Sequence, residues 1–174
     1  MWEALASEFS DLADTTELAR LVVRLLAAIL IGALIGYERE RHASPAGLRT
    51  HILVSLGAAL FVIVPAHVGF DDADMSRVVQ GLVAGIGFLG AGAILKQDEQ
   101  FRVRGLTTAA SIWLTAAIGI AAGLGQLMTA LIAALFGLVV LNVRAKGDHG
   151  ATKEGETPPE RYQAPGESAR QAKR

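Results

Sequence analysis

Charged side chains gather where the first apolar stretch of this sequence gives way to the second. Glu38 and Glu40 follow one stretch, and Arg49 precedes the other. Interfacial arginines commonly anchor membrane spans and pair with acids, whereas ionisable groups near membrane depth are costly and therefore mark candidate functional sites. Both interpretations stay open here. On the functional one, Glu38 or Glu40 lies in a vestibule at the membrane boundary and Arg49 steadies it.

Hydroxyl side chains form a second group that bears on chemistry. Thr108, Ser111 and Thr115 recur at i, i+3 and i+7, which places them on one face of a helix. Hydroxyls in hydrocarbon bond either the carbonyl one turn back in their own helix or a neighbouring helix. We prefer this interpretation to a path for a solute. Arg104, just before this stretch, joins the candidate polar residues.

Glycines are concentrated in two of the apolar stretches, and some are spaced by four residues. This spacing lets membrane helices approach closely, so we predict packing residues, within one molecule or in an oligomer. The alternative is a kinked or partly unwound helix that lines a cavity. The glycines concerned are Gly32, Gly36, Gly81, Gly85, Gly87 and Gly90.

Catalytic motifs do not support an enzyme. Residues 85–90 match GxGxxG, but they follow no strand, and no acid stands about twenty residues on to hold a ribose. Neither a phosphate-binding loop nor an HExxH pair nor a Ser/His/Asp set occurs. With no cysteine, the chain offers no thiolate metal site. We therefore predict a protein without catalysis or a cofactor, and a net charge of −1 without a basic domain gives no nucleic-acid partner.

Five apolar stretches must position these side chains. They cover residues 18–36, 52–68, 78–95, 106–122 and 127–143 of a 174-residue chain that is 52% hydrophobic. Their lengths lie near the ~17–25 residues that a helix needs to cross a bilayer, where all backbone groups must be paired internally. The sequence therefore predicts an all-α, polytopic membrane protein with five transmembrane helices in a lipid bilayer.

Positive charge falls on alternate connectors between these stretches. Arginine and lysine are frequent after the first, third and fifth stretches, absent before the first and scarce after the second. The positive-inside rule then places the N-terminus outside and the C-terminus in the cytoplasm. Arg20 and Arg24 depart from this pattern, because they share one helix face near the outer end of the first span.

The two ends of the chain have different character. Residues 1–17 carry apolar side chains at helical spacing, which predicts a short amphipathic helix on the outer membrane surface, with a disordered polar end as the alternative. Residues 14–17 form a capping-box pattern, so a new helix is expected to begin there. The membrane domain covers residues 18–144. Residues 145–174 lack apolar periodicity, and we expect a disordered cytoplasmic tail.

Four motifs together resemble the MgtC/SapB family of bacterial membrane proteins. They are GYERE at residues 36–40, AGLRTH at 46–51, GIGFLGAG at 85–92 and VRGLTTAA at 103–110. The resemblance covers residues 21–143 and implies a bacterial inner-membrane protein with about five spans. It also implies a link to magnesium limitation or acid stress. Longer relatives carry a soluble C-terminal domain that we expect to be absent here, so the resemblance does not extend to the virulence or ATP-synthase roles of particular members.

Two functions from different classes follow. The first is a non-catalytic factor in magnesium or ion homeostasis or stress adaptation, which acts through a membrane-protein partner. The second is a small channel or transporter for magnesium or protons, built as a homo-oligomer around Glu38, Arg49 and the hydroxyls near Thr108.

Overall fold

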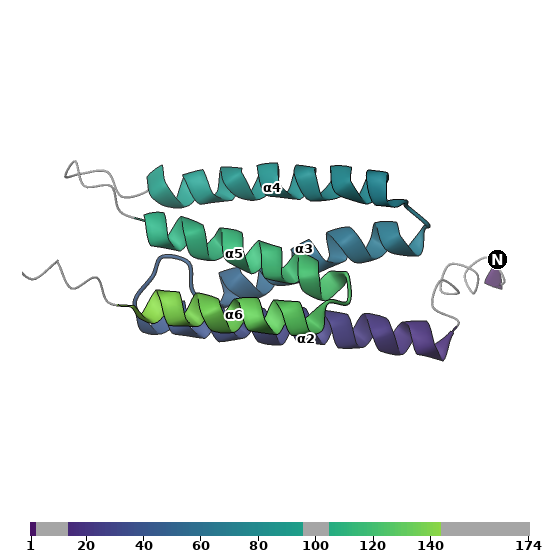
Figure 1. Cartoon of the computed structure of the whole chain (residues 1–174), viewed down its shortest axis with the longest axis horizontal. Helices are drawn as coiled ribbons and strands as arrows, with labels where there is room; N and C mark the ends of the chain where they lie inside the picture. The colour runs from purple at the N-terminus through teal and green to yellow at the C-terminus, as the bar shows by residue number, and fades with distance from the viewer. Residues whose placement is uncertain (3–13, 96–104, 144–174) are drawn as a thin grey trace, which may run out of the picture. The chain divides into compact units, whose positions relative to one another are not determined.

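Five α-helices make up the part of the chain that the structure describes. The structure is a computed structural model in which residues 1–2, 14–95 and 105–143 are described. The helices are α2 (Thr15–Arg41), α3 (Leu48–His67), α4 (Asp72–Leu95), α5 (Leu106–Gly123) and α6 (Leu127–Asn142) (Figure 1). These residues contain no strand, which confirms the all-α prediction. Residues 3–13, Arg104 and the predicted tail 145–174 lie outside the described residues.

Helix lengths agree with a membrane-spanning protein. Helices α2 to α5 are each long and apolar enough to cross a bilayer. Helix α6 has 16 residues, or about 24 Å at ~1.5 Å per residue, and so falls short of the ~30 Å hydrocarbon thickness. The predicted spans all coincide with helices, although α2 and α4 extend well beyond the apolar residues that predicted them.

The first helix begins where the capping pattern predicted. Asp14 precedes α2, and its carboxylate accepts a hydrogen bond of 2.8 Å from the Thr16 backbone N–H. This bond satisfies one of the amides that a helix start leaves without a partner. Glu17 instead forms an ion pair of 2.6 Å with Arg20. The helix start is thus confirmed, with one side chain acting as the cap.

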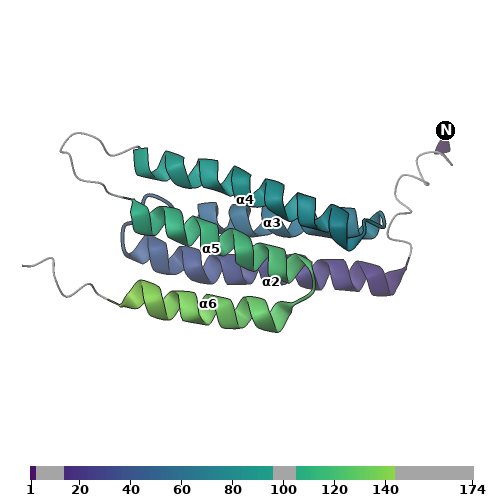
Figure 2. The same cartoon turned by 45° about the horizontal axis from the view of Figure 1, so that its top comes forward.

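Helix α5 is the central helix of the bundle. It packs against each of the other four, and Figures 1 and 2 show it between α4 and α6. Among the described helices, α4 packs only against α5 and α3. The apolar core joins α2, α3, α5 and α6 through small and branched side chains, namely Ala28, Ile31, Ile35, Ala59, Ile63, Ile118, Ala122, Ala130 and Ala134.

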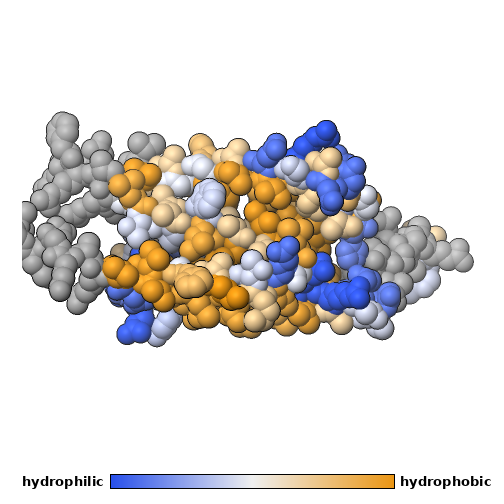
Figure 3. Space-filling view, viewed as in Figure 1, coloured by the Kyte–Doolittle hydropathy of each residue, from blue (hydrophilic) through white to orange (hydrophobic). Residues whose placement is uncertain are grey.

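Large apolar side chains also cover the outside of the bundle. Leu30, Phe88 and Phe136 are exposed by 67%, 81% and 68%. In Figure 3 apolar residues occupy the middle of the visible face, and hydrophilic residues gather towards the helix ends. An apolar outer surface of this kind suits a helix bundle whose solvent is lipid, because apolar side chains facing lipid lose nothing by exposure.

Two glycine pairs bring neighbouring helices against α3 at backbone distance. A Cβ placed on Gly36 would lie 2.8 Å from the Leu48 Cα, and one on Gly32 would lie 2.9 Å from the His51 carbonyl oxygen. On the other side of α3, Cβ atoms on Gly119 and Gly123 would overlap the backbone of Ser55 and Ala59. Helices α2 and α5 therefore approach α3 too closely for any side chain at these four positions.

Candidate functional site

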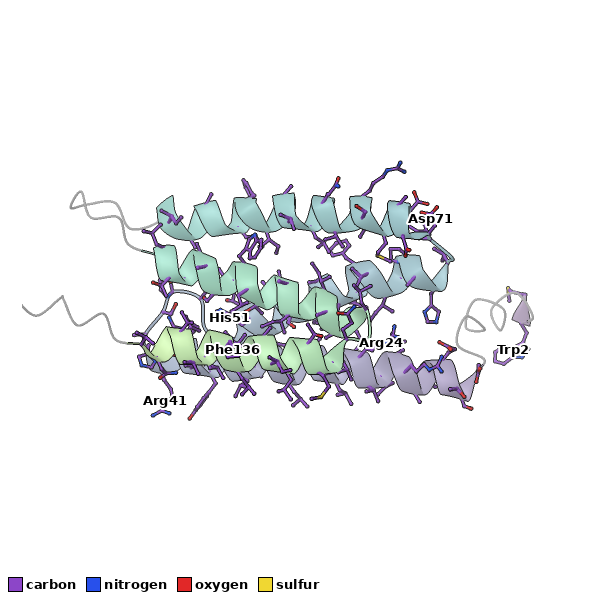
Figure 4. The ribbon with its side chains drawn as sticks, in the orientation of Figure 1. Trp2, Arg24, Arg41, His51, Asp71 and Phe136 are labelled. Atoms are coloured by element: carbon purple, nitrogen blue, oxygen red, sulfur yellow. The ribbon has the colours of Figure 1, made fainter. Side chains whose placement is uncertain are left out.

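Buried polar side chains gather where α2 ends, α3 begins and α5 begins. They come from these three helices, and the half-buried Ser44 of the connector between α2 and α3 lies beside them. Their burial follows from the glycine packing just described, which draws α2 and α5 onto the first turns of α3. Figure 4 shows His51 of α3 inside the bundle near this end, with Arg41 at its edge.

A buried ion pair joins Glu38 and Arg39. The Arg39 guanidinium donates from Nη2 to Glu38 Oε1 at 2.7 Å and from Nε to Glu38 Oε2, and the two residues are only 7–8% exposed. His42 Nδ1 lies 3.1 Å from Glu38 Oε1 and 2.9 Å from the Glu38 carbonyl oxygen. The bidentate geometry gives both carboxylate oxygens a charged hydrogen-bond donor, and these bonds replace the water that burial removes.

Arg49 does not steady Glu38, so that part of the functional interpretation is wrong. Arg49 is exposed in the first turn of α3 and forms no ion pair with any described residue. Arg39 takes its place, because it is the next residue of the same helix and its long side chain can fold back onto Glu38. The sequence motif contained Arg39, but adjacent helical residues point in different directions, so their pairing was not expected.

Glu40 caps a neighbouring helix. Its Oε2 accepts a 2.9 Å hydrogen bond from the backbone N–H of Leu48, the first residue of α3. Gly47 precedes that helix and has no side chain to do this. An exposed carboxylate at a helix N-terminus both accepts a free amide and meets the positive end of the helix dipole. Glu40 is therefore separate from the Glu38 pair.

A chain of hydrogen bonds runs from the α2–α3 connector into the bundle. Ser44 Oγ lies 3.1 Å from Thr108 Oγ1, and Ser111 Oγ donates to the Thr108 carbonyl oxygen at 2.8 Å. His51 is fully buried between Ser111 Oγ, 3.1 Å from its Nε2, and the Gly47 carbonyl oxygen, 2.9 Å from its Nδ1. We call Ser44, His51, Ser55, Thr108, Ser111 and Thr115 the polar track.

The inner end of the polar track is closed. Thr115 Oγ1 donates to the Ser111 carbonyl oxygen at 2.8 Å, as the preferred interpretation of the hydroxyl stripe predicted. Ser55 is fully buried, and its Oγ has no hydrogen-bond partner in the described structure. Beyond it the interface of α3 and α5 consists of apolar side chains that are buried almost completely, namely Ala59, Val62, Ile63, Ile118 and Ala122.

A cavity of about 500 Å³ borders the outer end of the polar track. It lies between the α2–α3 connector, the start of α3, α4 and α5, and Thr50 and Thr108 contribute its hydroxyl groups. Its remaining walls are apolar and include Phe88 and Leu89. No group of three acidic, histidine or cysteine side chains that could hold a metal ion occurs among the described residues.

Arg24 serves the opposite end of α5. Its Nη1 donates a 3.1 Å hydrogen bond to the carbonyl oxygen of Gly123, the last residue of that helix, and Figure 4 shows the side chain beside the α5–α6 turn. A guanidinium at a helix C-terminus satisfies a free carbonyl and complements the dipole. Arg20, on the same face, stays exposed with Glu17.

The predicted glycines fall into two groups. Gly32 and Gly36 touch α3 at backbone distance, and Gly90 lies towards α5, where a Cβ would be 3.6 Å from the Ala109 Cβ. Around Gly81, Gly85 and Gly87 a Cβ would meet nothing within 4 Å. A packing role for these three glycines stays a prediction, which requires a helix from outside the described bundle.

Comparisons with known proteins agree with the architecture. Residues 25–148 match the MgtC family. Protein SrpB of Synechococcus elongatus is 48% identical over 130 residues, which are 68% of this chain and 71% of SrpB. Protein MgtC of Brucella abortus is 46% identical over 123 residues, and Protein MgtC of Salmonella typhimurium is 47% identical over 114 residues.

The matches cover a larger share of this chain than of the two MgtC proteins. The matched residues are 71% and 66% of this chain but 50% and 48% of the two MgtC proteins, so the chain spans about half their length. No solved structure matches the chain. The family match covers most of the residues that form α2 to α6, including the whole polar track. The chain is therefore a member of the MgtC family, with an all-helical membrane fold.

Proposed function

We propose that this protein is a non-catalytic membrane factor in magnesium or ion homeostasis, or in stress adaptation, and that it acts through other membrane proteins. The magnesium link rests on its relatives, two of which bear the name Protein MgtC. The preference for action through other proteins over conduction rests on the closed polar track.

The closed polar track is the observation that carries the proposal. A conducting pore needs polar groups or water along its whole length, and sites that release the ion as readily as they bind it. Here the side chains of His51, Ser111 and Thr115 bond one another or the backbone of α5 over one part of the α3–α5 interface. Over the rest, Gly119 and Gly123 of α5 touch the α3 backbone. Such an interface stabilises a bundle and leaves no passage between α3 and α5.

Location and orientation belong to the same proposal. We place the protein in the bacterial inner membrane with five spans, the N-terminus outside and the C-terminus in the cytoplasm. The distribution of arginine and lysine along the connectors supports this orientation. The polar track then begins at the cytoplasmic end of the bundle, where Ser44 and Thr108 meet.

A channel or transporter remains the second candidate, and the cavity beside Thr108 is the observation that favours it. That cavity is lined partly by hydroxyls and reaches the outer end of the polar track. Conduction in a homo-oligomer would use a path between copies, because the α3–α5 interface within one copy is closed.

Vesicle flux and growth together test the proposal. The purified full chain, reconstituted in liposomes, is assayed for magnesium and proton uptake, with His51→Ala as a variant and Arg49→Ala as its exposed control. We expect no flux above protein-free vesicles. Flux that His51→Ala abolishes and Arg49→Ala keeps would refute the proposal in favour of conduction.

Growth of a deletion strain tests the homeostasis role directly. The gene is deleted in the organism that encodes it, and the deletion strain is grown at limiting and at ample magnesium. We expect a defect at limiting magnesium that the wild-type gene repairs. Normal growth of the deletion strain under magnesium limitation and under acid stress would contradict the homeostasis role.

A further inference from the structure

One of three similar glycine pairs in the described helices is not covered. Gly32/Gly36, Gly119/Gly123 and Gly81/Gly85 each have a spacing of four residues. The first two pairs lie against the α3 backbone, closer than a side chain would permit. The third pair, on α4, has no atom within 4 Å of where a Cβ would stand. Within this chain, the motif is elsewhere always filled by another helix.

The open pair belongs to a larger exposed face of α4. The helical repeat places Arg77, Gly81 and Ala84 in one row, and all three are exposed and line no cavity of the bundle. Leu82 and Ile86, on the opposite side, line a cavity of about 210 Å³ between α4 and α5. Only 11% of the apolar segment of α4 is buried, whereas 50% of the apolar segment of α5 is buried. Helix α4 thus has one face on the bundle and one without a partner.

The side chain of Gln80, on the outward side of α4, has no hydrogen-bond partner among the described residues. Gln80 is exposed and lies within the predicted third span. An amide that faces hydrocarbon without a partner is unfavourable, and interhelical hydrogen bonds of glutamine stabilise helix association in membranes. Because an amide is both donor and acceptor, a second glutamine placed by two-fold symmetry satisfies it on both sides.

The charged side chains at the start of α4 also suit a second copy of this chain as the partner of this face. Asp74 and Arg77 form an exposed ion pair of 3.0 Å one turn before Gln80. A face that carries one acid and one base is complementary to itself about a two-fold axis, since the acid of each copy can meet the base of the other. A partner helix with a single sign of charge there would not find this match.

We propose that this face of α4 is a homodimer interface, in which α4 of a second copy lies against Gln80, Gly81, Ala84 and Gly85. Both copies insert in the same orientation, so the two α4 helices run parallel and the two-fold axis stands perpendicular to the membrane. The inference goes beyond the proposed function and does not depend on it, because it concerns assembly alone.

Disulfide cross-linking tests the face directly. The chain has no cysteine, so a disulfide formed by a single introduced cysteine must join two copies. Ala84→Cys and Ala91→Cys, two turns apart at exposed positions, lie on the proposed face, and Leu82→Cys and Ile86→Cys are matched controls at similar depth on the other side. In liposomes of the full chain under mild oxidation, we expect dimers for the first two and background for the controls. Equal yields at all four positions would overturn the interface, since a disulfide requires Cα atoms within about 7 Å.

Dimer affinity in the bilayer tests the residues that carry it. Energy transfer between labelled copies is measured as lipid is added, for wild type, Gln80→Leu, Gly85→Leu and Gly57→Leu. Gly57, on α3, also has nothing within 4 Å, so it controls for the added side chain. We expect dissociation about tenfold easier for Gln80→Leu, and at least as large a loss for Gly85→Leu, with Gly57→Leu unchanged. A monomeric wild type, or a Gly85→Leu variant that dimerises as well as wild type, would refute the second copy as the partner of α4. The cysteine variants are also oxidised in native membranes, where cross-links formed only to a protein of another mass would refute it as well.

Discussion

Glu38 and Arg39 bring opposite charges together where little water reaches them. Removal of an ion pair's partner from such a position leaves a buried charge uncompensated, which is more destabilising than the pair itself is stabilising. His42 adds a ring nitrogen 3.1 Å from the same carboxylate, but its side chain is 57% exposed. The pairing of Glu38 therefore depends chiefly on Arg39.

Arg39→Ala is expected to destabilise the protein by about 3 kcal/mol, the scale reported for breaking a buried pair. Arg49 is exposed and belongs to no ion pair among the described residues, so Arg49→Ala should change the free energy of unfolding by less than about 0.5 kcal/mol. Reversible unfolding of the purified full chain in detergent measures both. Equal effects of the two substitutions would contradict the assignment of Arg39 as the partner of Glu38.

At the scale of helices, α3 is the element on which two others converge. Glycines of α2 and of α5 contact its backbone from two sides, and the polar track lies in the same region. In a bilayer no hydrophobic force draws helices together, so close backbone packing and interhelical hydrogen bonds are the main source of association. Arg24 adds a bond between α2 and the end of α5.

Gly36→Ala should disrupt the contact of α2 with α3. The added Cβ would lie 2.8 Å from the Leu48 Cα and 3.0 Å from the Leu48 carbonyl oxygen, neither of which can move without displacing the helix. We expect a loss of at least about 1 kcal/mol in unfolding free energy, the lower end for overpacking.

Gly57→Ala is the control for that substitution. Nothing lies within 4 Å of its Cβ position, and the gain in helix propensity, up to ~1 kcal/mol, should leave stability unchanged or higher. Thermal unfolding of both variants in the same detergent makes the comparison. If Gly36→Ala were as stable as Gly57→Ala, the close approach of α2 and α3 would be refuted.

At the scale of the whole molecule, two sets of polar groups lie at opposite ends of α5. The polar track begins near Thr108 at one end, and Arg24 bonds the Gly123 carbonyl at the other. Apolar packing separates them. If the bundle crosses the membrane as proposed, the first end faces the cytoplasm and the second faces outwards.

Cysteine labelling is expected to show that orientation. Ala43→Cys, in the α2–α3 connector, and Ala73→Cys, at the start of α4, are both exposed positions in a chain without cysteine. A membrane-impermeant maleimide is added to cells whose outer envelope has been permeabilised while the inner membrane stays intact. It should label Ala73→Cys at once and Ala43→Cys only after the cells are lysed. The reverse order would invert the topology, and immediate labelling of both would contradict an odd number of crossings between them.

The helices were predictable because hydrophobic length is a local property. A run of about twenty apolar residues must pair its backbone internally in lipid, whatever its neighbours are. The start of α2 was likewise predictable, since Asp14 acts on an amide two residues away. The extension of α2 to Arg41 was not, because its last turn is polar and is held by packing against α3.

The sequence by itself determined the helical class, the approximate bounds of five helices, the family and the region of the polar residues, because each follows from local composition or contiguous motifs. Only the tertiary structure decided that Glu38 pairs with Arg39, that His51 meets Ser111 and that α4 keeps an open face. These depend on side-chain rotamers and on how helices cross, and residues 60 positions apart in the chain come into contact only when the bundle forms.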